Sequence, residues 1–463
     1  MTRVAIIGGG ISGLSAAYSL KKLRSSGADI EYVLYEASSR FGGVLQTDLV
    51  HKCLIEAGPD SFLTEKSWAA DLCRELGLGD QLLTSNDAHR KTYIVKNGRL
   101  VPIPNGLMFM APTRFVPTLF SPLFSWNTKL AMAREWFAFP PSPITSDESV
   151  AAFVERHYGR EMLEQLVAPL LAGVYGGDAR QMSMFAVLPR FVEMEKKHGS
   201  LSRGIIRERK PASSSPSQPL FTSLKSGMQL FADTLAKTLQ PASLRPNTAV
   251  QALQPQGSKW LVSAGYDSDQ VDAIIIATPA YVAAKLLHIA DLELASELAA
   301  IPYNSSITVA LAFDQNVRAS LPPGFGFLVP ENEPIEILAA TFVHNKFPFR
   351  APEDTALIRC FLGGTNADDY MQLDDKAIVE IVRHDLNRVL GIAADPLFIS
   401  LHRWNRAMAQ YNVGHLDRLE RINTLRQKLP GLALAGNAYT GIGIPDCIRS
   451  GMHAAAEVLR AEN

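Results

Sequence analysis

The sequence predicts an α/β fold with more than one domain, and three observations lead to this prediction. The chain begins with a strand, a glycine-rich turn, a helix and a second strand, which is the order of a βαβ unit. Farther along, several strand-like segments follow one another with few helices between them, as in a mixed or antiparallel sheet. At 463 residues the chain is also longer than one hydrophobic core usually supports.

The first βαβ unit is predicted from local composition. Residues 3–7 are largely apolar and β-branched, which is typical of a strand buried on both faces. Residues 14–20 predict a helix, and residues 30–35 predict a second, parallel strand. The turn between the first strand and the helix consists almost entirely of glycine.

Each glycine of this turn has its own physical reason. Gly8 allows a tight turn, Gly10 lets a pyrophosphate approach the backbone, and Gly13 lets helix and strand pack closely. The helix N-terminus then offers N–H groups and its dipole to the phosphates. Glu36 ends the second strand and can accept hydrogen bonds from both ribose hydroxyls, whereas it would repel a ribose 2′-phosphate. The predicted ligand is FAD or NAD rather than NADP.

A further glycine-containing segment follows Glu36. It holds Arg40 and the paired glycines Gly42 and Gly43, and a Gly-Pro-Asp-Ser turn begins at Gly58. This arrangement resembles the FAD-containing amine oxidase superfamily, in which these residues continue along the cofactor. Nicotinamide dehydrogenases do not usually carry this extension, so the resemblance implies FAD.

Composition excludes several function classes. The formal net charge is −1 and no long run of Lys and Arg occurs, so nucleic acid is not an expected partner. The cysteines have neither CxxC nor metal-ligand spacing, so we expect no metal and reduced, mostly buried thiols of a cytosolic protein at Cys53, Cys73, Cys360 and Cys447. Because the N-terminus leads directly into the first strand, we expect no signal peptide.

The next segments leave the nucleotide-binding part. Residues 66–83 predict a helix, with Gly77 and Gly79 marking its end, and residues 92–101 predict a hairpin that turns at Asn97 and Gly98. Residues 102–143 are apolar, rich in aromatic side chains and interrupted by prolines, with no run of the roughly 18 apolar residues that a membrane-spanning helix needs.

Two interpretations of residues 102–143 remain. The favoured one is a buried helical lid. The other is a surface that enters a bilayer interface, with Lys129 and Arg134 near the headgroups.

Two helices are predicted at residues 147–158 and 161–171, and a glycine-rich segment follows them. Gly173, Gly176 and Gly177 suggest backbone lying against a flat group, with a structural turn as the alternative. Helix resumes through residues 191–197, and residues 210–219 predict a mobile loop rich in Ser and Pro.

The second half of the chain alternates between the two predicted parts. Strands and helices are expected at 221–224 (strand), 228–239 (helix), 249–253, 260–262, 273–277, 307–313, 326–330, 335–342 and 357–363 (strands), 376–390 (helix), 400–404 and 432–437 (strands). The segment 441–448 opens a final helix.

Four blocks make the resemblance specific. Residues 58–62, 171–178, 410–415 and 436–448 look like the bacterial protoporphyrinogen/coproporphyrinogen III oxidases of haem biosynthesis. The resemblance implies a cytoplasmic FAD enzyme acting on CH–CH and CH–NH groups, with O2 as acceptor and H2O2 as product. Its substrate would be a porphyrinogen, coproporphyrinogen III or protoporphyrinogen IX, oxidised by six electrons in three steps.

The resemblance also implies a domain layout and a set of FAD contacts. A Rossmann-like FAD-binding domain would combine residues 1–90, 221–290 and 411–463, a helical insertion would cover 91–220, and a mixed-sheet substrate domain would cover 291–410. The FAD contacts would be Gly8, Gly9, Gly10, Ile11, Ser12, Gly13, Glu36, Ala37, Arg40, Gly42, Gly43, Val44, Gly58, Pro59, Asp60, Ser61, Val250, Trp404, Ile442, Gly443 and Ile444. The final helix would direct its N-terminus at the flavin, favouring the negative charge of the reduced ring.

The implied substrate site needs no side-chain nucleophile. Gly173 would lie near the flavin, where a side chain would occupy the place of the substrate ring. Leu328, Thr341 and Phe361 would surround the macrocycle, with plain core packing as the alternative.

The cations that would pair with the propionates are less defined. Animal and plant protoporphyrinogen oxidases carry an arginine just before the tyrosine of the hairpin, whereas this chain has Thr92 there. Arg90 and Lys91 are the first candidates, followed by Lys346 and Arg350, with solvated surface charge as the alternative for each.

Two other functions stay open at this point. One is a different amine-oxidase-like enzyme, such as an amine oxidase or a carotene desaturase. The other is a non-catalytic escort protein on the same fold, which should not retain flavin. Two interactions also stay open: formation of a homodimer, and peripheral contact with the inner face of the membrane.

Overall fold

The structure is a computed structural model that describes residues 1–140, 146–208 and 219–460. All but the last residue of the loop predicted at 210–219 lies outside these ranges. The chain divides into two compact units. Unit 1 comprises Met1–Ser85, Pro219–Pro302 and Asp417–Asn463, and unit 2 comprises Asn86–Gln218 and Tyr303–Leu416.

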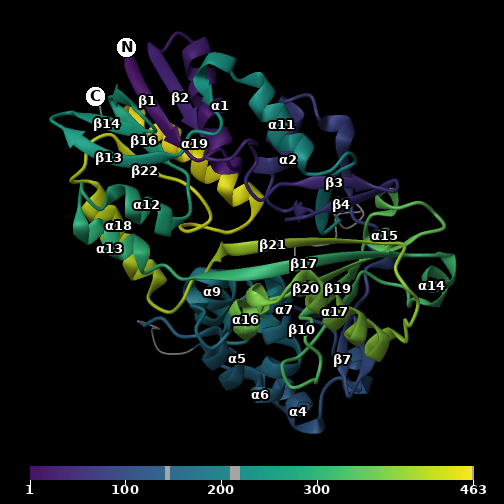
Figure 1. Ribbon diagram of the computed structural model, residues 1–463. Helices are drawn as coiled ribbons and strands as arrows, with labels where there is room; N and C mark the ends of the chain where they lie inside the picture. The colour runs from purple at the N-terminus through teal and green to yellow at the C-terminus, as the bar shows by residue number, and fades with distance from the viewer. Residues whose placement is uncertain (141–145, 209–218, 461–463) are drawn as a thin grey trace. The chain divides into compact units, whose positions relative to one another are not determined.

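Unit 1 is organised around a five-stranded parallel sheet (Figure 1). Its strands, in spatial order, are β12 (Leu244–Arg245), β2 (Ile30–Tyr35), β1 (Thr2–Ile7), β16 (Ala273–Ile276) and β22 (Leu432–Leu434). The central register places Ile6 between Leu34 and Ile275, and all three are fully buried. The predicted strands of the first βαβ unit are therefore confirmed as parallel neighbours.

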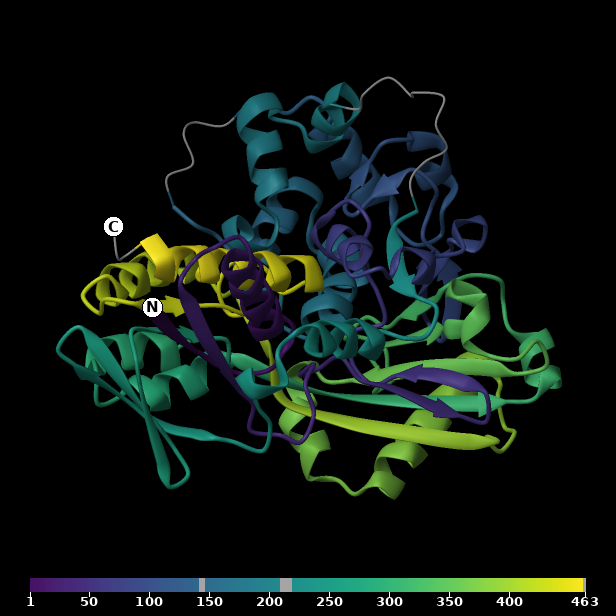
Figure 2. The same ribbon diagram turned by 90° about the horizontal axis from the view of Figure 1, so that it is seen from above.

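Two helices meet beside this sheet. α1 (Ile11–Ser25) and α19 (Ile444–Arg460) pack directly on each other, as the purple and yellow helices of Figure 2 show. A Cβ at Gly451 would lie 2.1 Å from the carbonyl oxygen of Ser12, so the helices approach backbone to backbone at this residue. This packing ties the start of α1 to the first turns of the final helix.

The remaining elements of unit 1 are small sheets and short helices. They are β3 (Thr47–Val50), β4 (Cys53–Glu56), β5 (Phe62–Leu63), α2 (Trp68–Glu75), η1 (Gly79–Gln81), β6 (Leu82–Thr84), β11 (Phe221–Leu224), α11 (Gln229–Thr238), η4 (Pro241–Ser243), β13 (Val250–Gln256), β14 (Lys259–Ala264), β15 (Asp267–Val271), α12 (Ala280–Leu287) and α13 (Leu292–Ala299), with α18 (His415–Arg426) at the boundary. The helix predicted at 66–83 is wrong beyond Glu75. Gly77 takes a positive φ of 76°, and residues 82–84 then pair with β11.

Unit 2 contains a seven-stranded mixed sheet (Figure 1). In spatial order its strands are β21 (Phe398–Ala409), β17 (Tyr303–Phe313), β20 (Ala356–Leu362), β19 (Ala339–Phe342), β18 (Gly326–Leu328), β7 (Thr92–Lys96) and β8 (Arg99–Pro102). β7 and β8 form the predicted hairpin, with positive φ at Asn97 and Gly98.

One face of this sheet is covered by α17 (Asp375–Leu390). Ile378, Val382 and Leu386 of the helix share a core with sheet residues such as Val309 and Ile358. The strand predicted at 335–342 begins only at Ala339, because the N–H groups of residues 336 and 337 donate to the Asp385 carboxylate of α17 instead of to a strand.

The helices of unit 2 come from the segments of the sequence on either side of residues 141–145. Its elements are η2 (Asp87–His89), β9 (Leu107–Met108), β10 (Ala111–Pro112), α3 (Phe115–Phe120), α4 (Trp126–Glu135), α5 (Val150–Tyr158), α6 (Arg160–Met162), the π-helical turn η3 (Leu163–Val167), α7 (Ala168–Tyr175), α8 (Met184–Val187), α9 (Pro189–His198) and α10 (Leu201–Glu208). Shorter elements beside the sheet are α14 (Gln315–Ser320), α15 (Val343–Lys346), η5 (Pro348–Arg350), η6 (Gly364–Asn366) and α16 (Ala367–Gln372).

Buried carboxylates join these helices. Glu135 at the end of α4 accepts hydrogen bonds from Ser200 Oγ and from the N–H of Leu201, which opens α10. Glu195 of α9 accepts from Arg156 Nη2 at 2.7 Å and from a ring nitrogen of His157 at 2.9 Å, both on α5.

All four cysteines are buried thiols without a disulfide, as predicted. Within the described ranges, no helix combines the length and apolarity needed to cross a bilayer. The same residues contain no group of three His, Cys, Asp or Glu side chains that could hold a metal ion.

Candidate functional site

In the loop after β1, one glycine has space around it for a side chain, and the neighbouring glycines have none. At Gly8, with φ of 104°, an added Cβ would lie 2.8 Å from the carbonyl oxygen of Ala277. At Gly13 it would lie 1.9 Å from the carbonyl oxygen of Gly8. At Gly10 nothing lies within 4 Å of such a Cβ. Gly10 therefore borders open space at the N-terminus of α1, where N–H groups and the helix dipole favour an anion.

Glu36 is held next to this loop by donors of its own unit. The N–H of Gly9 donates to Oε2 at 2.7 Å, and the N–H and Oγ of Ser38 donate to Oε1 at 2.8 and 2.7 Å. A carboxylate oxygen accepts about two hydrogen bonds, so Oε2 retains capacity for one ribose hydroxyl. A second ribose hydroxyl would have to replace the Ser38 hydroxyl.

The second glycine segment lies beside the first. The N–H of Gly42 donates to the carbonyl oxygen of Gly9 at 2.8 Å. Arg40 donates to the carbonyl oxygens of Leu45, at 3.0 Å, and Gly43. Arg40 therefore stabilises the shape of this segment. Its direct contact with FAD remains a prediction.

The turn at Gly58 closes on the same segment. An added Cβ at Gly58 would lie 1.9 Å from the carbonyl oxygen of Val44. The carbonyl oxygen of Asp60 accepts a hydrogen bond from Ser223 Oγ at 2.6 Å, and Ser61 Oγ donates to the Asp60 carboxylate. Unit 1 thus gathers three glycine-rich backbone segments, which is what an extended dinucleotide needs.

The last helix of unit 1 adds a further N-terminus. Asp446 lies in the first turn of α19, is 4% exposed, and pairs with Lys66 at 2.6 Å. Side chains at Gly441 or Gly443 would contact this carboxylate, at 2.5 Å from Cγ and 3.2 Å from Oδ2 respectively. Because the positive charge of Lys66 compensates the negative charge of Asp446, the positive end of the helix dipole remains available to an anionic ligand.

The predicted FAD contacts fall in unit 1, with one exception. Val250 starts β13, shortly after Thr248, whose N–H donates to the carbonyl oxygen of Glu36. Trp404 lies on β21 of unit 2, opposite Ser306. The direct contacts of all these residues with FAD remain predictions.

The open face of the unit 2 sheet carries the predicted substrate residues. Paired residues of neighbouring strands lie on one face. Phe361 and Leu328 are each paired with Ala339, and Thr341 is two residues farther along β19. Their side chains therefore share the face opposite α17, and each is partly exposed. The sheet brings together three residues that are separate in the sequence.

α7 brings Gly173 to this same face. An added Cβ at Gly173 would lie 3.3 Å from Leu328 Cδ2, and Gly173 itself is exposed. The predicted turn starts at Gly176 rather than Gly173, because α7 continues to Tyr175 and Gly176 takes the left-handed conformation that ends it. The π-helical turn precedes α7, and Pro169 lacks the N–H that an α-helix would use there.

Arg359 is a residue of this face that sequence reasoning missed. It is 5% exposed, is paired with Thr341, and its guanidinium lies 4.8 Å from the centre of the Phe361 ring. The alternation of Arg359 and Phe361 along one predicted strand was the signal that could have found it.

The cations expected for the propionates lie elsewhere in unit 2. Lys91 lies over the ring of Tyr93, on the face of the sheet toward α17, and Arg90 pairs with Asp87 at 3.7 Å. Lys346 and Arg350 both lie near the Phe347 ring, and Arg350 is 2% exposed. Thr92 is on the open face, opposite Gly326.

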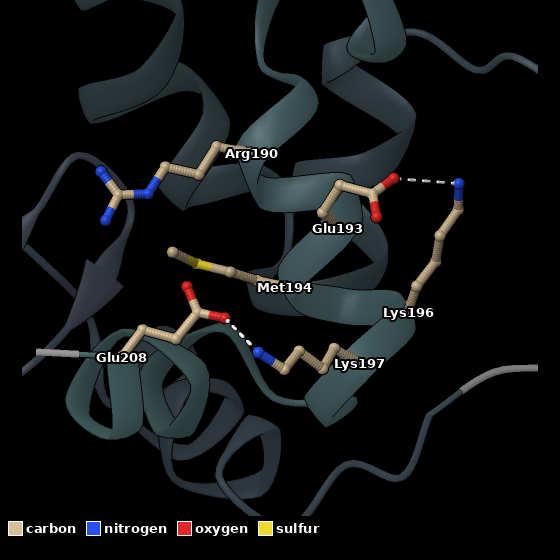
Figure 3. Close-up of a pocket in the computed structure, with 6 residues that line it drawn as sticks. All are labelled: Arg190, Glu193, Met194, Lys196, Lys197 and Glu208. Carbon is tan, nitrogen blue, oxygen red and sulfur yellow. Dashed lines mark hydrogen bonds and ion pairs between the residues drawn. The ribbon is translucent and has the colours of Figure 1, made fainter.

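A separate hollow of about 500 Å³ lies along α9 (Figure 3). Its charged side chains are partly matched in ion pairs, Lys196 with Glu193 and Lys197 with Glu208, each at 3.2 Å. Exposed ion pairs of this kind contribute little to the free energy of unfolding. A large apolar ring needs a mostly apolar pocket, so this hollow does not suit one.

The segment 115–139 exposes large apolar side chains. We define its aromatic surface as Phe115, Val116, Leu119, Phe120, Trp126, Leu130, Phe137 and Phe139, of which Phe120, Trp126, Phe137 and Phe139 are 72–85% exposed. Lys129 lies over the Trp126 ring at 4.9 Å. Such exposure is unusual for a fully buried lid.

The chain is similar to known proteins along nearly its whole length. Residues 11–459 match the family described as flavin containing amine oxidoreductase. The chain is 34% identical to coproporphyrinogen III oxidase of Bacillus subtilis, over 98% of this chain and 97% of that protein, and 32% identical to the Staphylococcus aureus enzyme of the same name, over 98% of both. The crystal structure of a protein assigned as a protoporphyrinogen oxidase from Exiguobacterium sp. 255-15 superposes with a TM-score of 0.89, at 30% identity and 99% coverage of both chains.

Proposed function

Because this chain belongs to the family of flavin-containing amine oxidoreductases, we propose that it is an FAD-dependent porphyrinogen oxidase of haem biosynthesis. The similarity to coproporphyrinogen III oxidases along almost the whole chain carries this proposal. Coproporphyrinogen III is the favoured substrate on this ground, with protoporphyrinogen IX as the alternative.

The residues of each unit have a distinct task in this reaction. In unit 1, the glycine loop at Gly10 binds the pyrophosphate and Glu36 binds the adenosine ribose. In unit 2, Leu328, Thr341 and Phe361 hold the macrocycle in place, and Gly173 leaves room for it. When bound, FAD would supply the hydride acceptor, with O2 as the final oxidant and H2O2 as its product.

No side chain has to act as a nucleophile in this scheme. The pyrrole protons can leave to water, so the protein contributes binding, orientation and exclusion of side reactions. Arg359 adds a cation to a face that also carries Leu328, Phe361 and Thr341, which suits a ring that carries carboxylates on one edge.

Turnover of the purified holoenzyme tests the proposal. We expect aerobic conversion of coproporphyrinogen III or protoporphyrinogen IX to the fluorescent porphyrin, above the autoxidation control, with three H2O2 for each porphyrin. Turnover of amines without porphyrin formation would favour an amine oxidase. A colourless protein that cannot take up FAD would favour the escort function.

We further propose that the enzyme is cytoplasmic and that its aromatic surface contacts the membrane peripherally. The exposed aromatic side chains support this over the buried lid, and Lys129 and Arg134 on α4 supply cations for anionic headgroups. Association of two copies through the same surface is the competing outcome.

A further inference from the structure

We propose that Gln410 is a positioning residue for the substrate site, because its side-chain amide holds the last turn of α7 and thereby sets the distance between Gly173 and Leu328. The inference rests on the proposed function, in which these two residues border the macrocycle. Gln410 follows β21 directly and belongs to the block that carried the resemblance.

The contacts of Gln410 are made with backbone. Its Nε2 donates to the carbonyl oxygen of Tyr175 at 2.8 Å and to that of Met408 at 3.1 Å. The side chain belongs to a residue that is 3% exposed. Tyr175 is the last residue of α7, so the amide binds one of the carbonyls that a helix leaves without an intrahelical partner.

The adjoining glycines fit this contact. Gly176 takes φ of 60° and ends the helix. An added Cβ at Gly177 would lie 1.9 Å from Gln410 Oε1, so the amide can reach Tyr175 only because residue 177 has no side chain. At Gly177, the flat group that the glycine accommodates is therefore the amide of Gln410, whereas a Cβ at Gly176 would lie 3.1 Å from Met408 Sδ.

A second amide binds the next carbonyl. Asn304 Nδ2 donates to the carbonyl oxygen of Gly176 at 2.5 Å. Asn304 lies near the start of β17, where it pairs with Met408 of β21. One amide thus lies on β17 and the other directly after its partner strand β21, and together they tie the end of α7 to the sheet.

The same sheet carries the opposite wall of the site. Leu328 lies on β18, and Gly173 lies two residues before Tyr175 on α7. Since a strand pair and a helix turn are both stiff, fixing the helix end to the sheet fixes Gly173 against Leu328 and thereby the shape of the exposed surface beside them, on which the ring would lie. Loss of the amide should shift Gly173 relative to Leu328 without removing any group that contacts substrate.

Gln410→Met tests the inference, since Met has a similar length but no donor. We expect the KM for the porphyrinogen to rise about tenfold, as the loss of one ordinary hydrogen bond allows, with a smaller change in kcat. The flavin content and absorption spectrum should stay those of the parent. A merely structural role would lower the fraction of active protein and leave KM unchanged.

Asn412→Ala is the matched control, because its amide is only two residues away and binds the Gln181 side chain at 3.2 Å near the surface. It should leave KM within twofold. If Gln410→Met does not fold, Asn304→Leu removes the neighbouring contact and should raise KM in the same way.

The outcomes separate this inference from the proposed function. If Gly173→Leu abolishes turnover but neither amide variant changes KM, the positioning role is wrong and the site stands. If Gly173→Leu has parental kinetics, the site assignment itself is wrong.

Discussion

A Cβ at position 173 would lie 3.3 Å from Leu328 Cδ2, so Gly173 and Leu328 face each other at the distance of a tight contact. One residue comes from a helix and the other from a strand, and 155 positions of the chain separate them. Because Gly173 is exposed, the surface beside this contact is accessible to a ligand.

Gly173→Leu should therefore abolish porphyrinogen turnover while FAD is retained. A leucine side chain would press on Leu328 and cover the exposed surface beside it that the ring needs, and we expect kcat/KM to fall by about a hundredfold or more. Steady-state kinetics and the flavin absorption spectrum measure both properties.

The control for added bulk is Ala152→Leu, on an exposed position of α5 in the same unit. It should keep the parental kinetics. Equal losses in both variants would mean that bulk on a helix of unit 2, rather than occupation of the site, causes the effect.

Gly10→Val should produce a folded protein that does not retain FAD. Position 10 has an extended conformation that any residue adopts, with φ of −68° and ψ of 179°, and no protein atom lies near an added Cβ. The side chain would meet only the phosphates of the ligand. Flavin fluorescence released from the denatured protein, together with the unfolding temperature, gives the result.

Gly79→Ala serves as its control, since an added Cβ there lies 4.0 Å from the Arg74 side chain and no ligand is expected. This variant should be as yellow as the parent. A yellow Gly10→Val protein would contradict the assignment of the phosphate loop.

Arg156→Leu should destabilise unit 2 in a pH-dependent way. Burial raises the pKa of Glu195, but hydrogen bonds from Arg156 and His157 outweigh burial and lower the pKa to about 2. The Glu195 carboxylate therefore stabilises the fold at pH values above the usual pKa of a glutamate. This stabilisation is lost as the pH falls toward 2. Removing Arg156 at neutral pH should cost about 2 kcal/mol, between the costs of breaking a buried and an exposed ion pair, because Glu195 is 3% exposed whereas the Arg156 side chain is 39% exposed.

Urea unfolding of the parent and of the Arg156→Leu variant at several pH values measures this cost. The difference between their free energies of unfolding should shrink as the pH falls below 4. Arg160→Leu is the comparison, because its pair with Glu164 is exposed and should contribute less than about 1 kcal/mol. Equal costs for the two arginines would contradict the role of burial.

The aromatic surface should bind anionic vesicles. We expect the holoenzyme to float with phosphatidylglycerol-containing liposomes, and the double variant Phe120→Ser with Phe139→Ser to lose most of this binding, since both side chains are at least 79% exposed. Leu397→Ser, at an exposed apolar residue outside the segment, should bind like the parent.

If the parent does not float, membrane contact is wrong. A concentration-dependent increase in molecular mass that the double variant lacks would then assign the surface to a second copy of the chain.

The nucleotide-binding part could be predicted from the sequence because its signals are local. Gly8, Gly10 and Gly13 lie within one turn and a helix start, and the structure gives Gly8 a positive φ, Gly10 open space and Gly13 a close approach to backbone. The helix expected at 66–83 was less predictable, since Leu82 and Leu83 suit a helix and a strand equally and pairing with β11 decided between them.

The substrate site depended on contacts distant in sequence. Leu328, Thr341 and Phe361 could be named from a resemblance, but no local pattern shows that they share a face, and Arg359 between them was missed. The role of Gly177 was likewise hidden, because the Gln410 amide that requires it comes from more than two hundred positions later.

Order along the chain was enough to specify the parallel βαβ start, the glycine loop and the carboxylate of Glu36, because these features depend on neighbouring residues and on backbone geometry. Strand pairing and helix packing decided which side chains of the second unit meet. Burial and register are properties of the folded chain as a whole, so the contact between Gly173 and Leu328 exists only after distant segments have come together.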